Sequence, residues 1–120
     1  MTKKELAISL HGPGSNCAQS VLRAFTEETG LDEATATAIA NGFGRGVRSG
    51  EICGAITGGV MALGLIAENK GITDIKNITN EYVAEFTKAY GCVRCEELKQ
   101  NKISCDELIG FAAEVLEKYV

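Results

Sequence analysis

The chain has 120 residues, 45% of them hydrophobic, which suits one globular domain over residues 1–120. Its formal net charge is −4 and it contains no run of lysine or arginine, so a nucleic-acid-binding protein, which carries a basic face, is not expected. Ala, Leu, Glu and Lys recur at helical spacing, and β-branched alternation is rare. We therefore expect an all-α fold, a compact single-domain bundle of about five to seven helices.

Two stretches bear on export and on membranes. The first ten residues, MTKKELAISL, have no sustained apolar run, so they do not resemble a secretory signal and we expect a cytoplasmic protein. The longest uncharged run, residues 52–67, is diluted by four glycines and is shorter than the roughly 20 apolar residues that a membrane span needs. We expect this run to form a buried central helix and no membrane span.

The first three helices are predicted from breakers and caps. A helix over residues 2–10 ends at the HGPG segment, 11–14. Ser15 or Asn16 caps a second helix, 16–30, which ends at Gly30, and Asp32 starts a third, 32–43. His11, the sole histidine, falls in the HGPG break and is expected to be solvated.

Residues 42–50, GFGRGVRSG, hold four glycines in nine positions and predict a loop. The G-x-G-x-G pattern within it does not indicate nucleotide binding, because the residues before it favour a helix where a dinucleotide fingerprint needs a strand. We interpret Arg45 and Arg48 as solvated basic residues of this loop, although their charges could also attract an anionic partner. Ser49 is the predicted cap of a glycine-bearing helix that runs to about Asn69.

Three further helices complete the chain. Asn77 or Thr79 is expected to open a helix that ends at Gly91, and residues 92–100 form a short helix after it. Ser104 and Glu107 match an S-x-x-E capping box, which predicts the start of the last helix.

Five cysteines in a chain expected in the cytoplasm favour thiol or metal chemistry over structural disulfides, which a cytosol keeps reduced. All five fall at or near predicted helix N-termini: Cys17, Cys53, Cys92, Cys95 and Cys105. A helix N-terminus presents unpaired N–H groups and roughly half a positive charge, which stabilises a thiolate and lowers the thiol pKa. We expect these helix ends to converge and to form one electropositive thiol pocket.

Glycines at Gly54 and Gly58 strip side chains from one surface of the central helix, where they cost helix stability. Either another helix or a cofactor can approach such a surface, and the sequence leaves both open. With Gly44 and Gly46 of the loop, they are the predicted close-approach positions.

The chain resembles the redox-active family named for its C, GCAxxG, C, C pattern. The family's CGAxxG motif is CGAITG here, residues 53–58, with NCAQSVLRAF before it and GCVRCEEL and SCDEL after it. The resemblance covers residues 16–117 and implies fold and site without naming a substrate. By position, it assigns the four signature cysteines to Cys17, Cys53, Cys95 and Cys105, and leaves Cys92 as an addition.

Two hypotheses follow for function. In the first, the four cysteines exchange thiols and disulfides, or pass electrons, with an unidentified redox partner, and Cys53 is the first choice of nucleophile. In the second, Cys17, Cys53, Cys95 and Cys105 are thiolate ligands of a [2Fe–2S] cluster or zinc, in a module without turnover. A helical scaffold with incidental buried cysteines is the third, and plainest, interpretation.

Cys92, the single histidine and the glycine-bearing helix each suggest a further interpretation. Cys92 creates a C-x-x-C motif with Cys95, but no βαβ unit indicates a thioredoxin fold. We interpret Cys92 as a peripheral, resolving or spare thiol, or as one half of a local disulfide with Cys95. With one histidine in a loop, no Ser-His-Asp or Cys-His-Asn set can be built, so hydrolysis is not expected. The glycine-surfaced helix could also meet its own copy in a homo-oligomer.

Overall fold

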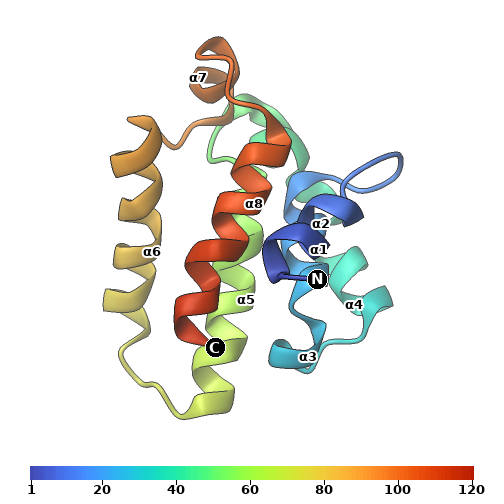
Figure 1. Cartoon of the computed structure of the whole chain (residues 1–120), viewed down its shortest axis with the longest axis vertical. Helices are drawn as coiled ribbons and strands as arrows, with labels where there is room; N and C mark the ends of the chain where they lie inside the picture. The colour runs from blue at the N-terminus through green and yellow to red at the C-terminus, as the bar shows by residue number, and fades with distance from the viewer.

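The computed structural model describes residues 1–120 and confirms the all-α fold class (Figure 1). Eight α-helices are present: α1 (Lys3–Leu10), α2 (Cys17–Ala24), α3 (Thr26–Thr29), α4 (Glu33–Ile39), α5 (Gly54–Lys70), α6 (Ile75–Tyr90), α7 (Cys95–Gln100) and α8 (Cys105–Leu116). Short 3-10 turns span Asn41–Phe43 and Glu117–Tyr119, and an irregular turn spans Gly46–Gly50. No helix has the length and apolar character needed to cross a membrane.

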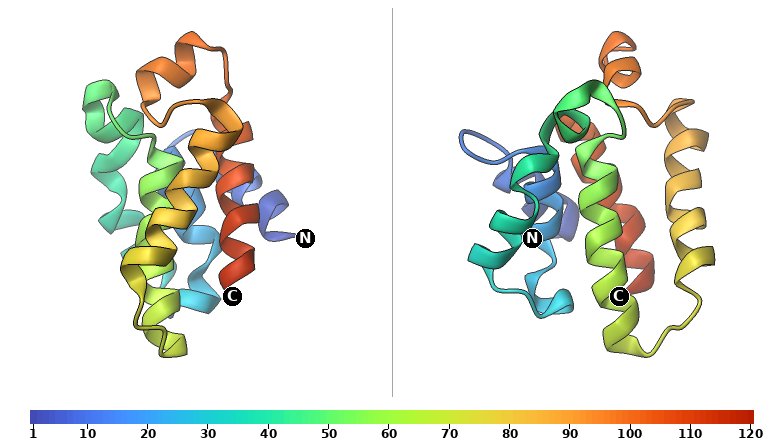
Figure 2. Two further views of the ribbon diagram at one scale, coloured as in Figure 1. Left: turned by 90° about the vertical axis from the view of Figure 1, so that its left-hand side faces the viewer. Right: turned by 180° about the vertical axis from the view of Figure 1, so that it is seen from behind.

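Helix α5 is the centre of the bundle. Helices α2 and α8 pack along it, and α1 lies against both of them. Helix α6 packs on the side of α5 and α8 that faces away from α2 and α4 (Figure 2). Helix α7 lies at the end of the bundle where α5 and α8 begin, next to the turn Gly46–Gly50 (Figure 1). The expected buried central helix is therefore present as α5.

The core is built from the apolar faces of these helices. Its largest fully buried side chains include Phe25, Leu63, Tyr82 and Phe86. The Tyr82 and Phe86 rings meet edge to face with 5.4 Å between their centroids, a favoured aromatic geometry. The buried Tyr82 hydroxyl donates a hydrogen bond of 3.1 Å to the carbonyl of Ala55, which ties α6 to the first turn of α5.

The glycines of α5 allow two close approaches. A Cβ on Gly58 would lie 2.5 Å from the carbonyl oxygen of Ala18, and one on Gly54 would lie 3.2 Å from the Ala18 nitrogen. A Cβ on Gly59 would lie 1.8 Å from the Tyr82 hydroxyl. Helix α2 therefore packs on this surface at Gly54 and Gly58, and Gly54 also lines a pocket.

Several boundaries differ from the predicted ones. The expected helix 16–30 breaks at Phe25, whose φ of −113° and ψ of 30° divide it into α2 and α3, so eight helices are present. Helix α6 begins at Ile75, earlier than Asn77 or Thr79, because Asp74 and the residues after it already adopt the helical hydrogen-bond pattern. The start of α8 is where the sequence placed it, with Ser104 Oγ accepting from the Glu107 N–H at 3.1 Å.

Ser49 does not cap α5. Its hydroxyl donates to the carbonyl of Gly46 at 2.8 Å, inside the turn Gly46–Gly50, and α5 starts four residues later than Ser49 would allow. The backbone after Ser49 explains the shift, because φ is 75° at Gly50 and ψ is −140° at Glu51. A right-handed helix cannot pass through residues in these conformations.

Candidate thiol site

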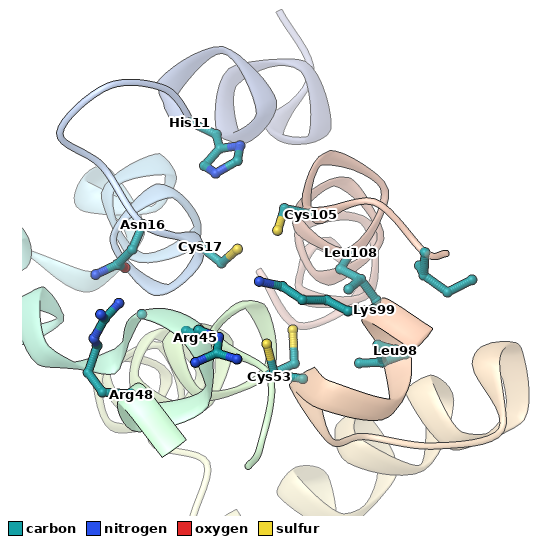
Figure 3. Close-up of a pocket in the computed structure, with 14 residues that line it drawn as sticks. His11, Asn16, Cys17, Arg45, Arg48, Cys53, Leu98, Lys99, Cys105 and Leu108 are labelled. Carbon is teal, nitrogen blue, oxygen red and sulfur yellow. The ribbon is translucent and has the colours of Figure 1, made fainter. Parts of the chain in front are cut away.

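Four of the five cysteines line one pocket, with a cavity volume of about 200 Å³, at the end of the bundle near α7 (Figure 3). The sequence predicted this convergence of Cys17, Cys53, Cys95 and Cys105, and the structure brings them together. The other lining residues are His11, Asn16, Gly44, Arg45, Arg48, Gly54, Leu98, Lys99, Ile103 and Leu108.

Each of the four cysteines stands where a helix starts. Cys17, Cys95 and Cys105 are the first residues of α2, α7 and α8, and Cys53 immediately precedes α5. Asn16 accepts a hydrogen bond of 2.8 Å from the Gln19 N–H, which fixes the first turn of α2. The positive ends of several helix dipoles therefore face the same pocket.

Cys53 and Cys95 are held by a backbone bridge between distant segments. The Cys53 N–H donates to the Val93 carbonyl at 2.9 Å, and the Cys95 N–H donates to the Glu51 carbonyl at 2.6 Å. The Arg94 guanidinium reinforces the bridge with a 3.2 Å ion pair to the Glu51 carboxylate. Both thiols are consequently fixed on one side of the pocket, and both are buried.

The other two thiols lie beside the histidine. Ligand atoms of His11, Cys17 and Cys105 all lie within 4.8 Å of one another. His11 Nδ1 is 2.8 Å from the Asp106 Oδ1, which orients the ring. Figure 3 shows the Cys17 and Cys105 sulfurs pointing toward each other, with the His11 ring above them.

The Cys17 and Cys105 thiols have different acidities. The pKa of Cys105 is lowered to about 6, chiefly by the Cys17 thiol, which can donate an S–H hydrogen bond to it, and also by the charges of His11 and Lys99. The pKa of Cys17 is raised because the same interaction and burial favour its protonated form. A shared proton therefore stays on Cys17, and the thiolate forms on Cys105.

Cys53 is not the most acidic thiol of the site. Its side chain is 3% exposed, and this burial raises its pKa to about 11, although backbone N–H groups of the first turn of α5 oppose the shift. Burial disfavours the charged form more than the helix terminus favours it. Cys105, which is half-buried near His11 and Lys99, therefore has a lower thiol pKa than Cys53.

Cations line the pocket, and no aspartate or glutamate does. Arg45 and Arg48 are exposed, as expected for a solvated loop, and both of them line the pocket together with the partly buried His11. Lys99 was not singled out by the sequence analysis. Its position four residues after Cys95, on the same face of a short helix, was the signal that could have found it.

Cys92 lies outside this pocket, so it does not take part in the convergence expected of all five cysteines. It also lies before the first residue of α7 and not within the helix. It follows the end of α6 and precedes α7 by three residues because Gly91, with φ of 80°, ends α6 in a left-handed turn. Its sulfur lies 3.8 Å from the Tyr90 carbonyl oxygen and 3.9 Å from the Asn101 amide nitrogen. All five cysteines are free thiols in this structure.

The glycines near the site serve close packing. A Cβ on Gly44 would lie 3.1 Å from the Asn16 Cβ, and one on Gly46 would lie 2.4 Å from the Glu51 carbonyl oxygen. Gly46 also has a φ of 60°. Gly44 therefore lets the chain lie close to Asn16 at the start of α2, and Gly46 lets the turn fold back onto Glu51.

The donor set also suits a soft or borderline metal ion. Thiolate and imidazole ligands are those that zinc and iron–sulfur centres use. The group whose atoms converge is His11, Cys17 and Cys105, whereas the sequence pattern suggested the four cysteines. His11 would bind through Nε2 because Nδ1 faces Asp106.

Fold and site together define a small all-α protein with a thiol-lined, cation-rimmed pocket. The chain matches a family described as "Putative redox-active protein (C_GCAxxG_C_C)" over residues 15–119, and it belongs to that family. The resemblance seen in the CGAITG motif, residues 53–58, is thereby confirmed. Comparisons with curated proteins and with solved structures found no match.

Proposed function

We propose that this protein is a dithiol–disulfide redox protein whose reactive pair is Cys17 and Cys105. The observation that carries the proposal is the side-by-side placement of these two thiols in one pocket, with ligand atoms of both within 4.8 Å. A pair of thiols that can reach one another is the requirement for reversible disulfide formation.

The reaction has two steps. The Cys105 thiolate attacks one sulfur of a substrate disulfide, an S–S bond breaks, a mixed disulfide forms and the first substrate thiol leaves with a proton. Cys17 then attacks the Cys105 sulfur, and the second substrate thiol leaves with the proton that Cys17 carried. Two electrons pass from the protein dithiol to the substrate disulfide, and a Cys17–Cys105 disulfide remains.

The surrounding residues have separate tasks in this scheme. The charges of Lys99 and His11 stabilise the attacking thiolate on Cys105. Cys53 and Cys95 line the same pocket and are candidates for a second dithiol that receives the oxidation. A redox partner must reduce the protein again, and free cysteines favour a reducing compartment, which we take to be the cytoplasm.

Single-turnover oxidation tests the proposal. The reduced protein is mixed with hydroxyethyl disulfide, a neutral probe, and the modified cysteines are mapped by mass spectrometry. We expect two thiols to be lost as a Cys17–Cys105 disulfide, a stable mixed disulfide on Cys105 in Cys17→Ser, and little reaction in Cys105→Ser. Cys92→Ser is the matched control, since Cys92 lies outside the pocket. Unchanged exchange in Cys105→Ser would refute the assignment.

A metal centre is the second candidate, favoured by the converging His11, Cys17 and Cys105 atoms and by Asp106 behind the histidine. Protein purified without oxygen would be examined by absorption spectroscopy and elemental analysis. Stoichiometric zinc or iron that is lost in His11→Ala would support a centre with imidazole ligation. Metal retained in His11→Ala and lost in Cys53→Ser would point to the four-cysteine [2Fe–2S] or zinc site instead.

A further inference from the structure

The charge of the pocket is opposite to that of the chain. The formal net charge of the protein is −4, whereas the charged side chains that line the pocket are Arg45, Arg48 and Lys99, joined by His11 when it is protonated. No carboxylate lines the pocket. A concave site of one sign concentrates ligands of the other sign and raises their association rate.

These cations are not used by the fold. The other two arginines of the chain, Arg23 and Arg94, form ion pairs, whereas Arg45 and Arg48 form none. Lys99 also lacks an ion pair, although the α7 turn that precedes it carries acidic residues. Their charges are therefore available to a ligand.

The backbone is distorted where the two arginines stand. Arg45, Val47 and Arg48 all have positive φ, and the left-handed conformation is unfavourable for a β-branched residue such as Val47. Gly46 anchors the turn, because its carbonyl accepts from the Glu51 N–H at 3.2 Å. Strain of this kind persists where the surrounding structure requires it, and here it accompanies two arginines that line the pocket.

The side chains of Lys99 and Arg45 point into the pocket. Figure 3 shows the Lys99 side chain extending across the pocket toward Cys17, and the Arg45 guanidinium pointing toward Cys53. The Arg48 guanidinium turns instead toward Asn16. A carboxylate held by Arg45 and Lys99 would therefore lie next to the sulfur that is attacked.

We propose that the pocket selects small disulfides that carry carboxylate groups, with Arg45 and Lys99 binding the carboxylates while Cys105 attacks the substrate sulfur. The selection rests on the dithiol chemistry proposed above and adds the substrate class. A cavity of about 200 Å³ holds one arm of such a molecule, not a folded protein loop. The S–S bond of the substrate breaks, Cys17 and Cys105 supply two electrons, and the two carboxylate-bearing thiols leave with the two protons.

The test compares three symmetric disulfides in single-turnover kinetics with pre-reduced protein: dithiodipropionate (two carboxylates), hydroxyethyl disulfide (neutral) and cystamine (two ammonium groups). The protein variants are the wild type, the double variant Arg45→Gln with Lys99→Gln, and Lys70→Gln. Lys70 is the matched control, an exposed lysine without an ion pair at the far end of α5. Because Lys99 also affects Cys105 acidity, each rate is divided by the rate for hydroxyethyl disulfide.

We expect the dithiodipropionate-to-hydroxyethyl ratio to fall about tenfold in the double variant, the cystamine ratio to rise, and neither to change in Lys70→Gln. The wild-type ratio should also fall with added salt, which screens charges beyond about 10 Å at 0.1 M. Wild-type protein that reacts with all three disulfides, but with ratios equal to those of the double variant, would overturn the charge selection and leave the dithiol chemistry standing. Wild-type protein that reacts with none would overturn both.

Discussion

Gly58→Ala tests how the packing of α2 on α5 supports the site. The new Cβ would lie 2.5 Å from the carbonyl oxygen of Ala18 and 2.8 Å from the Ala18 Cα. Both atoms are backbone, so no flexible side chain can move aside. The Ala18 oxygen must retreat by about 1 Å to reach the ~3.5 Å at which van der Waals contact is favourable. Helix α2 must therefore shift, and Cys17 at its start shifts with it.

The magnitude follows from two opposing effects. Overpacking of a well-packed core costs about 1–3 kcal/mol, and replacing glycine by alanine within a helix returns up to about 1 kcal/mol. We expect a net loss of up to about 2 kcal/mol, which lowers Tm by up to roughly 8 °C in a chain of this size. Because the shift of α2 changes the position of Cys17 relative to Cys105, the rate of disulfide formation between them should also change.

The matched control lies on the same helix. A Cβ on Gly64 would meet nothing within 4 Å, so Gly64→Ala should raise Tm by about 4 °C through helix propensity alone. Urea and thermal unfolding followed by circular dichroism give both free energies. Equal stabilisation by Gly58→Ala and Gly64→Ala would show that α2 does not press on α5 as described, and the reasoning would fail.

Three further predictions concern single residues. Alkylation of Cys105 by iodoacetamide in the reduced protein should rise with a midpoint near pH 6, because its thiolate is stabilised, whereas Cys53, with a pKa raised to about 11, should stay unreactive through pH 8; a reversed order would contradict the acidity argument. Ser104→Ala removes the cap of α8 and should cost about 1 kcal/mol in urea unfolding, and no change would mean that water replaces the cap. Cys92→Ser should leave the number of thiols oxidised in the pocket unchanged, and the loss of a disulfide in this variant would show pairing with Cys95.

Helix boundaries could be predicted from the sequence where an N-cap residue or a C-terminal glycine marks them. Ser104, Asn16 and the C-terminal glycines Gly71 and Gly91 stand where the structure begins or ends helices. The break at Phe25 could not be predicted, since no glycine, proline or other local breaker stands there. The start of α5 was missed because Gly50 adopts a left-handed conformation and Glu51 is also non-helical, and the sequence around the predicted Ser49 cap does not reveal either conformation.

The sequence predicted which cysteines form the site, but it did not predict the relative pKa values of their thiols. Placing cysteines at helix starts was enough to anticipate that four of them meet. Their relative pKa values depend on burial and on neighbours from other elements, such as His11 and Lys99 beside Cys105, which sequence spacing does not reveal. For the same reason, the local helix-terminus argument favoured Cys53, where burial has the larger effect.

The contact between the starts of α2 and α8 also links oxidation to folding. Cys17 and Cys105 lie 88 positions apart in the chain, so a bond between them would close a loop that includes most of the protein. By the chain-entropy model, closing such a loop restricts the unfolded ensemble by about 4.5 kcal/mol. The oxidised form would then melt at a higher temperature, and the folded state would hold its disulfide against reduction more firmly than the unfolded chain would.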